Sequence, residues 1–295
     1  MKQVWKLFPV CGLCLCLTGC VKMALRLTPS FIPRLSQTFF EECDADLAGA
    51  SLPASLKLME GLLKNDPENR RILTALCTGF SGYALLFVED ENPETASSLY
   101  LRARDYGLKA LGWQVPSRGM GNLASNVIRK RLESVGSGGL EALFWTTMAW
   151  NAWINLNLDQ PAALGQLSAA QACLERVLEI KPDFFYGAPY ILMGTILSAM
   201  PGPLGGDAAK ARQFFEKSLE MSKGKFFLAQ YYFARYYAVR AQNKRLFLKL
   251  IEQVRKTAPD ELREVCLINA VMKRKIEHLQ EMTDDLFLCT SDPAD

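Results

Sequence analysis

The fold of this chain is decided by the stretch Phe80-Ser81-Gly82-Tyr83-Ala84-Leu85-Leu86-Phe87, because its pattern occurs four times in the sequence. In each copy an apolar or aromatic residue is followed at +3 by a large apolar residue, at +4 by Ala or Gly, and at +7 by another apolar residue. These offsets lie on one side of an α-helix, where the small residue lets a second helix approach closely. The motif predicts an all-α helical-repeat protein, a class that usually binds rather than catalyses. The other copies are Trp145/Met148/Ala149/Ala152, Tyr190/Met193/Gly194/Leu197 and Gln230/Phe233/Ala234/Tyr237, in which Ala152 and Gln230 are imperfect members.

Nearly the whole chain beyond Pro53 has helical period, and we find no convincing strand run. One helix is expected from Ser55 to Lys64, closing just before Pro67 as the second helix of a tetratricopeptide repeat does. A final helix over 261–283 is expected to cap the array, with Lys273-Arg274-Lys275 on the polar outer face that a terminal repeat needs. Between them we expect four helix pairs: 70–88 with 94–112, 139–157 with 161–180, 185–199 with 207–222, and 226–241 with 245–257.

The small residues of the four motifs are 65, 45 and 40 residues apart. A regular tetratricopeptide repeat has about 34 residues, so insertions are expected. The largest, 117–138, contains a short predicted helix with Arg129, Lys130 and Arg131, and it is either a contact surface for another protein or a solvated excursion. The second, Met200 to Asp207, is expected to be a tight turn in which Asp207 caps the next helix.

The N-terminus has the features of a bacterial export signal. Lys2 and Lys6 flank its start, and the apolar run from Leu7 to Leu17 is too short to span a bilayer. The run ends in Leu17-Thr18-Gly19-Cys20, and small residues directly before a Cys resemble a lipobox. We therefore expect a lipoprotein signal peptide over 1–19 and acylation of Cys20, which would anchor the chain to a membrane. The alternative is an ordinary signal peptide with an incidental Cys. The other expected domains are 20–50, a lipidated tether and entry segment, and 51–290, the tetratricopeptide-like domain.

Composition and motifs argue against several classes of protein. The chain has 295 residues and a net charge of +3, of which Lys2 and Lys6 would leave with the signal. That is too little basic excess for a nucleic-acid binder. The lone His278 has no positioned partner, and no GxGxxG, Walker A or HExxH pattern occurs. We therefore expect neither an enzyme nor a cofactor.

The cysteines do not form a metal-binding pattern. Five would remain after loss of the signal and acylation of Cys20, without any CxxC pair or nearby His. A zinc site is therefore not expected. The five are buried small hydrophobes or include one disulfide. They are Cys43, Cys77, Cys173, Cys266 and Cys289.

A second helical face points to a binding groove. In a tetratricopeptide-like array the first helix of each pair lines the concave surface, and offsets 1, 5 and 8 lie about 110° around the helix from the motif. That face combines aromatic, apolar and hydroxyl groups with one cation, Arg235, whose planar fork could pair with a carboxylate. The competing interpretation is that the two tryptophans belong to the core and that Arg235 is a solvated or internally paired charge. The candidate groove residues are Thr146, Trp150, Trp153, Ile191, Thr195, Tyr231 and Arg235.

The order of several short motifs resembles a known family. The resemblance begins at Leu52-Pro53 and Leu56 to Leu63, continues through Pro67-Glu68-Asn69 and Tyr83-Ala84, and ends near Asn269. Together with the lipobox, this order is similar to that of the TatT-like T components of tripartite ATP-independent periplasmic (TRAP) transporters. Thr78-Gly79 and the 117–138 segment depart from the family pattern.

The resemblance implies a periplasm-facing, membrane-anchored lipoprotein with a tetratricopeptide-like fold. It implies association with the solute-binding component of a TRAP transporter, and a ligand that is a hydrophobic small molecule or an organic acid carrying a carboxylate. It also implies homo-oligomers, with trimers expected, and a ligand-accessible cavity in each protomer.

Two other classes remain as alternatives. A tetratricopeptide scaffold for an envelope assembly machine should have an open, mostly polar groove and no enclosed cavity. A hydrolase or transferase on a helical scaffold needs a clustered nucleophile and base, which the sequence does not offer.

Overall fold

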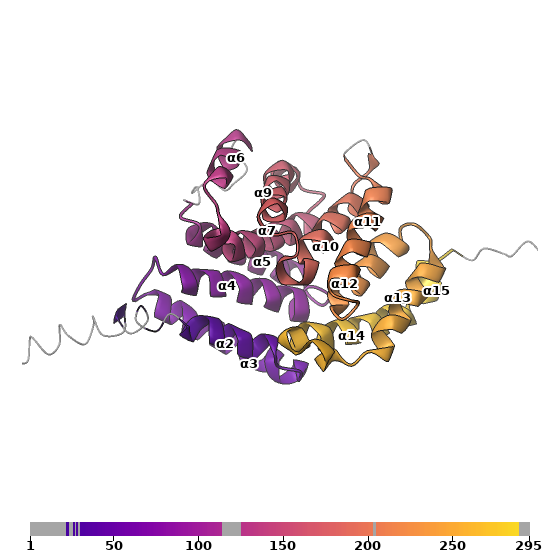
Figure 1. Cartoon of the computed structure of the whole chain (residues 1–295), viewed down its shortest axis with the longest axis horizontal. Coiled ribbons are helices and arrows are strands. Elements are labelled where there is room, and N and C mark those ends of the chain that lie inside the picture. Colours follow the sequence, from indigo (N-terminus) through magenta and orange to yellow (C-terminus); the bar gives the residue numbers. More distant parts are fainter. Residues whose placement is uncertain are drawn as a thin grey trace, which may run out of the picture.

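The computed structural model describes residues 30–113, 125–202 and 205–288, together with Lys22, Met23, Arg26 and Thr28. Every regular element in these residues is helical, which confirms the predicted all-α class (Figure 1). The predicted signal peptide over 1–19, the acylation site Cys20, and Cys289 lie outside the described residues. The first part of the 117–138 insertion, up to residue 124, also lies outside them.

In the part of the chain that the structure describes, two helices precede the first predicted helix pair. They are α2 (Phe31–Phe40) and α3 (Ala45–Leu63), so the predicted boundary at residue 51 falls within a helix. The helix predicted to start at Ser55 begins ten residues earlier, after Asp44, whose side chain accepts hydrogen bonds from two backbone N–H groups of the first turn. Pro53 lies inside α3, although an interior proline removes a backbone donor. The sequence-based prediction placed a boundary at this proline, and the packing of α3 overrides it.

The predicted helix pairs are present, with outer bounds that differ by no more than about three residues, but the helix predicted over 161–180 is divided in two at residues 165–166. Helix α4 (Arg70–Tyr83) continues into a π-helical turn, η2 (Ala84–Val88), and packs against α5 (Pro93–Ala110). Helix α7 (Leu140–Leu156) packs against α9 (Leu167–Ile180), with the short α8 (Pro161–Leu164) between them in sequence.

The second half of the chain repeats this arrangement. Helix α10 (Phe184–Ala199) packs against α11 (Ala208–Met221). Helix α12 (Phe227–Tyr232) continues into a second π-helical turn, η6 (Phe233–Ala238), which packs against α13 (Lys244–Lys256). The predicted short helix of the 117–138 insertion is α6 (Ser125–Glu133), which is followed by the 3-10 turn η4 (Ser137–Gly139).

The small residue at +4 of each motif is buried, as the motif requires. A Cβ added to Gly194 would lie 2.9 Å from the ring of Phe215, so α10 and α11 approach too closely there for a larger side chain. Asp207 caps α11 as predicted, its carboxylate accepting from the backbone N–H of Lys210 at 3.0 Å. The continuous helix Arg70–Val88 is long and apolar enough to span a membrane, but 67% of its most apolar window is buried inside this fold. Its apolar composition is accounted for by the core.

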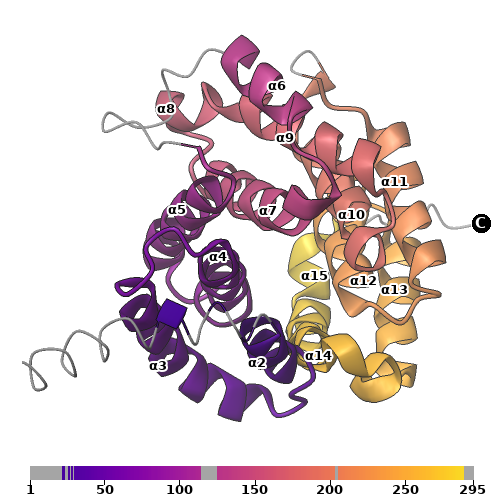
Figure 2. The same ribbon diagram turned by 60° about the vertical axis from the view of Figure 1, so that its left-hand side comes forward.

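The last helices return to the first. After the 3-10 segment η7 (Pro259–Val265), helix α14 (Cys266–Glu281) contacts α2, α3 and η2, and the short α15 (Thr283–Leu286) follows it. A disulfide joins Cys43, between α2 and α3, to Cys266 at the start of α14. Figure 2 shows the helices following one another around a closed course, with α14 beside α2. The array is therefore a ring whose two ends are covalently joined.

This closure corrects the prediction for the basic stretch of the last helix. Arg274 donates two hydrogen bonds to Asp46 on α3, at 2.6 and 3.0 Å. Lys275 donates to Asp90 at 2.6 Å and to the Leu85 carbonyl oxygen at 2.9 Å. Lys273 donates to the backbone carbonyls of Arg255 and Thr257, at the C-terminal end of α13. These cations bind neighbouring segments and do not form the outer face of an open array, because the array has no open end here.

Candidate ligand-binding cavity

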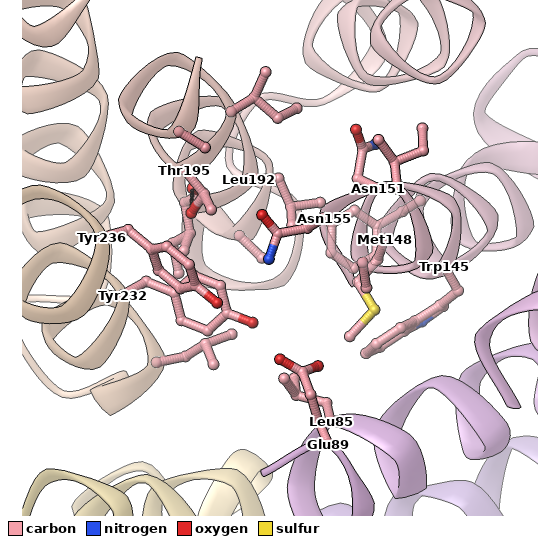
Figure 3. Close-up of a pocket in the computed structure, with 18 of the residues that line it drawn as sticks. Leu85, Glu89, Trp145, Met148, Asn151, Asn155, Leu192, Thr195, Tyr232 and Tyr236 are labelled. Atoms are coloured by element: carbon pink, nitrogen blue, oxygen red, sulfur yellow. Dashed lines mark hydrogen bonds between the residues drawn. The ribbon is translucent and has the colours of Figure 1, made fainter. Parts of the chain in front are cut away.

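The four helices that carry the motif surround one cavity. It encloses about 1090 Å³ of space between atoms, counting its opening to solvent. Most of its lining is apolar, with a few convergent polar groups, as is typical of small-molecule sites. Figure 3 shows Trp145 and Met148 on one side of the space, and Tyr232 and Tyr236 on the opposite side. The apolar wall includes Leu85, Trp145, Met148, Ile191, Leu192 and Ile268.

One position of the helical motif recurs in the cavity lining. Offset 6 of the motif faces the cavity in all four helices, as Leu86, Asn151, Ile196 and Tyr236. The predicted groove face was centred on offsets 1, 5 and 8, and successive residues of an α-helix are rotated by about 100°. The true face therefore lies about one residue further around the helix than predicted.

An aromatic wall closes one side of the cavity. Phe185, a lining residue, has its ring centroid 5.3 Å from that of Trp145 and 5.5 Å from that of Phe40. Its backbone has φ of 45°, and Tyr186 follows with φ of 59°. For non-glycine residues this left-handed conformation costs about 1–2 kcal/mol each. The fold holds this strained turn at the start of α10, and the turn directs Phe185 into the aromatic wall.

The polar side chains of the lining converge from three helices. Figure 3 shows the Glu89 carboxylate and the hydroxyl groups of Tyr232 and Tyr236 directed toward the centre of the space, with Asn155 near them. Asn151 is buried, and its Oδ1 has no hydrogen-bond partner among the described residues. The cavity therefore offers acceptors and neutral donors next to a large apolar surface.

Glu89 is the one charged residue that lines the cavity within the described part of the chain. Burial raises its pKa, and the hydrogen bond from the Tyr100 hydroxyl and the charges of Lys275 and Arg235 only partly offset this effect. Glu89 directly follows η2, and Tyr236 lies within η6. A π-helical turn contains an extra residue and so changes the direction of the residues that follow, and such turns are frequent at functional sites. Both π-helical turns occur in cavity-lining helices, next to polar lining residues.

A charged cluster lies directly behind this corner of the cavity. Arg235 donates to Asp90 at 3.1 Å and to the hydroxyl of Tyr231, and Lys275 donates to Asp90 at 2.6 Å. Burial acts to raise the pKa of Asp90, but the hydrogen bond and charge of Lys275, with those of Arg235, outweigh it and hold the pKa below its usual value. The cluster joins η2, η6 and α14, which are distant in the sequence.

The predicted groove residues are separated into three groups. Ile191 and Thr195 line the cavity. Tyr231 and Arg235 lie one layer behind it, with the Arg235 guanidinium carbon 5.7 Å from the ring centroid of the lining residue Tyr236. The remaining three, on α7, do not line the cavity at all: Thr146, Trp150 and Trp153.

The three α7 residues belong to the core because α7 is enclosed by both α5 and α9. Trp150 is fully buried and donates from Nε1 to the Gln166 side chain at 2.9 Å. The buried Arg104 of α5 lies 5.8 Å from the ring centroids of Trp150 and Trp153. Thr146 hydrogen-bonds to the Ala142 carbonyl oxygen and packs where Gly107 of α5 has no side chain. The predicted groove residues of α7 are therefore part of the core and not of a ligand-binding surface.

The sequence analysis missed the polar residues that line the cavity. Glu89 belongs to the acidic run Glu89-Asp90-Glu91 at a helix end, and a run of this kind is usually a solvated turn. Tyr232 and Tyr236 stand one residue after the two groove candidates Tyr231 and Arg235. Applying offset 6 consistently to all four motifs would have found Tyr236 and Asn151. No signal in the sequence distinguished Glu89 from its acidic neighbours.

We expect the Asp90→Asn variant to be less stable than the wild type by about 0.5–1 kcal/mol at neutral pH, because two cations lose a charged acceptor that is itself partly exposed. The contribution of Asp90 is present above the ordinary pKa of an aspartate and is lost as the pH falls through the lowered folded-state pKa. Denaturant unfolding from pH 7 to pH 3 should therefore show a gap between the two proteins that closes in acid. The control is Glu91→Gln, an exposed carboxylate one residue away. A gap of constant size at all pH values would contradict this account.

Among the described residues, no group of three or more His, Cys, Asp or Glu side chains is placed to hold a metal ion. The fold is all-α, and its helices surround a mostly apolar cavity. The sequence model of the TRAP transporter T-component family matches residues 41–287. The chain therefore belongs to the TRAP transporter T-component family. That family supplies components of bacterial transport systems that face the periplasm.

One similar protein comes from Treponema pallidum (strain Nichols), where it is described only as an uncharacterized protein. It is 27% identical over 197 residues, which is 61% of this chain and 61% of that protein. The chain thus matches somewhat less than two thirds of the relative's length, and the relative's description adds no activity.

Proposed function

We propose that this chain is a membrane-anchored lipoprotein that associates with the solute-binding component of a TRAP transporter and assists the uptake of a hydrophobic or organic-acid ligand. The observation that carries the proposal is the apolar cavity formed by all four motif helices. A ligand handed between two proteins needs a site on each of them, and a mostly apolar cavity with a few polar groups suits a small molecule.

The proposal includes several features of the whole protein. Acylation of Cys20 would supply the membrane anchor on the periplasmic side, and the helix pairs would form a tetratricopeptide-like array. Homo-oligomers, with trimers expected, would present several cavities to the transporter. We also propose that the chain has no catalytic activity of its own, since its site offers a carboxylate, hydroxyls and amides without a paired nucleophile and base.

The main alternative is a scaffold for an envelope assembly machine. Such a scaffold should have an open and mostly polar groove. The cavity is instead mostly apolar, and the ring around it is closed by the Cys43–Cys266 disulfide. This favours a small-molecule role over a scaffold role.

We expect the full-length protein, extracted from membranes with mild detergent, to retain the solute-binding protein of a TRAP transporter from the same organism. The two proteins should be co-expressed and an affinity tag placed on the solute-binding protein, so that the named partner is tested directly. Mass spectrometry of small molecules in the purified complex should detect an apolar compound. A solute-binding protein from an unrelated transporter is the control.

Three outcomes would count against the proposed function. The first is equal retention by the cognate and the unrelated solute-binding protein. The second is no retention by either. The third is stable association with an envelope assembly machine in the same extract, which would favour the scaffold alternative.

A further inference from the structure

The cavity lining contains an acidic side chain but no basic side chain among the described residues. Glu89 carries the one carboxyl group of the lining, and no lysine or arginine lines the cavity within the described residues. The two cations behind this corner, Arg235 and Lys275, both donate to Asp90, and neither is a lining residue. A ligand in the cavity can therefore contact the Glu89 carboxyl group directly, whereas no lysine or arginine side chain among the described residues lines the cavity.

The Glu89 carboxylate is positioned to accept a hydrogen bond from a ligand. Its Oε2 accepts from the Tyr100 hydroxyl, and its Oε1 has no partner among the described residues. Tyr100 is fully buried, so it fixes the carboxylate from behind without blocking the cavity. The hydroxyls of Tyr232 and Tyr236, which face the same point, are also without hydrogen-bond partners in the described structure. One donor group of a ligand could thus satisfy the free oxygen of Glu89 and one of the tyrosines.

The opposite side of the cavity fits an apolar body. Trp145, Met148, Leu192 and Ile196 present hydrocarbon and aromatic surface over several helical turns. Asn151 and Asn155 are neutral and add no positive charge. The lining thus combines a polar corner at Glu89 with a large apolar surface that neutral polar groups interrupt, which is the pattern expected for an amphiphile.

We propose that the cavity binds an amphiphile whose apolar body carries a hydrogen-bond-donating head group, an amine or a hydroxyl, at Glu89, and that it discriminates against carboxylates. This inference rests on the proposed role of the cavity as a ligand site. It narrows the ligand class, because an organic acid would place its own anion next to Glu89. Two like charges in a partly buried site repel strongly enough to change affinity by an order of magnitude or more.

The test compares three ligands of equal chain length on the full-length, disulfide-intact protein: decylamine, decanol and decanoate. Affinities are measured by isothermal titration calorimetry at neutral pH, below the concentration at which each ligand forms micelles. We expect decanoate to bind at least about tenfold more weakly than decylamine and decanol. This comparison needs no variant, so it does not depend on any variant folding.

Variants then locate the effect. Glu89→Gln should bring decanoate to within about threefold of decanol and weaken decylamine about tenfold, because the charge is lost and the shape is kept. Glu91→Gln, an exposed carboxylate in the same segment, should change none of the three affinities. Ala152→Phe, which adds a ring to the lining, should weaken all three ligands together.

The inference is overturned if decanoate binds as tightly as the other two ligands, or if Glu89→Gln leaves the order unchanged. It is also overturned if none of the three binds. Retention of the solute-binding protein is measured in a separate experiment. The proposed transporter role can therefore hold even if the proposed ligand class is wrong. Loss of that retention with the ligand order intact would instead overturn the transporter role and leave the cavity chemistry standing.

Discussion

Replacing both Cys43 and Cys266 by alanine is expected to lower the free energy of unfolding by about 2–5 kcal/mol. The disulfide joins residues 223 positions apart, so it restricts the unfolded chain over most of its length. It also holds α14 against the connection between α2 and α3, where the ring closes. Alanine is preferred to serine because Cys266 is fully buried, and a hydroxyl there would need a hydrogen-bond partner.

The measurement is guanidinium-induced unfolding with and without reductant. Reduction of the wild type should lower its stability to about that of the double variant, and the double variant should not respond to reductant. Cys77 and Cys173 are buried and unpaired, so they supply no second bond to reduce. Equal stability of the wild type and the double variant under oxidising conditions would show that the ring is held by packing alone.

Replacing Trp150 by alanine is expected to destabilise the protein by about 3–5 kcal/mol, because a fully buried indole is lost and its space cannot be refilled by neighbouring helices. The indole fills the space where α7 meets α5 and α9. Its Nε1 donates to the Gln166 side chain at 2.9 Å, and Arg104 hydrogen-bonds to the same side-chain oxygen at 3.3 Å. The variant thus also weakens a buried polar network.

Trp150→Phe separates packing from ligand binding. It keeps most of the apolar volume and removes the donor, so we expect a loss of only about 1–2 kcal/mol. Because Trp150 does not line the cavity, the affinity of this variant for decanol should match that of the wild type. A large loss of affinity in a well-folded Trp150→Phe protein would restore the original groove interpretation of α7.

Local patterns allowed most of the helices to be predicted. The bounds of α4, α5 and α7 to α13 follow from apolar periodicity, from the asparagine and aspartate caps, and from proline positions. Pro53 misled the prediction because an interior proline is normally a boundary, and its position in α3 depends on tertiary packing. The cavity face was misplaced because the sequence does not show how far each helix is rotated about its own axis.

Contacts between the two ends of the chain could not be predicted from local patterns. Asp46 and Arg274 are 228 residues apart, and each alone is an ordinary surface charge. The π-helical turns were also missed, since an extra residue in one turn leaves the apolar pattern almost unchanged. The resemblance to a family therefore gave the function class, while the chemistry of the cavity required the three-dimensional arrangement.

The closed ring has a mechanical consequence. An open solenoid can extend and twist, because small rotations between neighbouring repeats add up and its free ends move apart. A closed ring cannot extend in this way, since a rotation at one helix pair must be compensated by rotations at the other pairs of the ring. With the Cys43–Cys266 bond in place, we expect the cavity that the ring surrounds to keep a nearly constant width. We therefore expect small molecules to enter through the existing opening of the cavity to solvent, and not through a gap opened between neighbouring helix pairs.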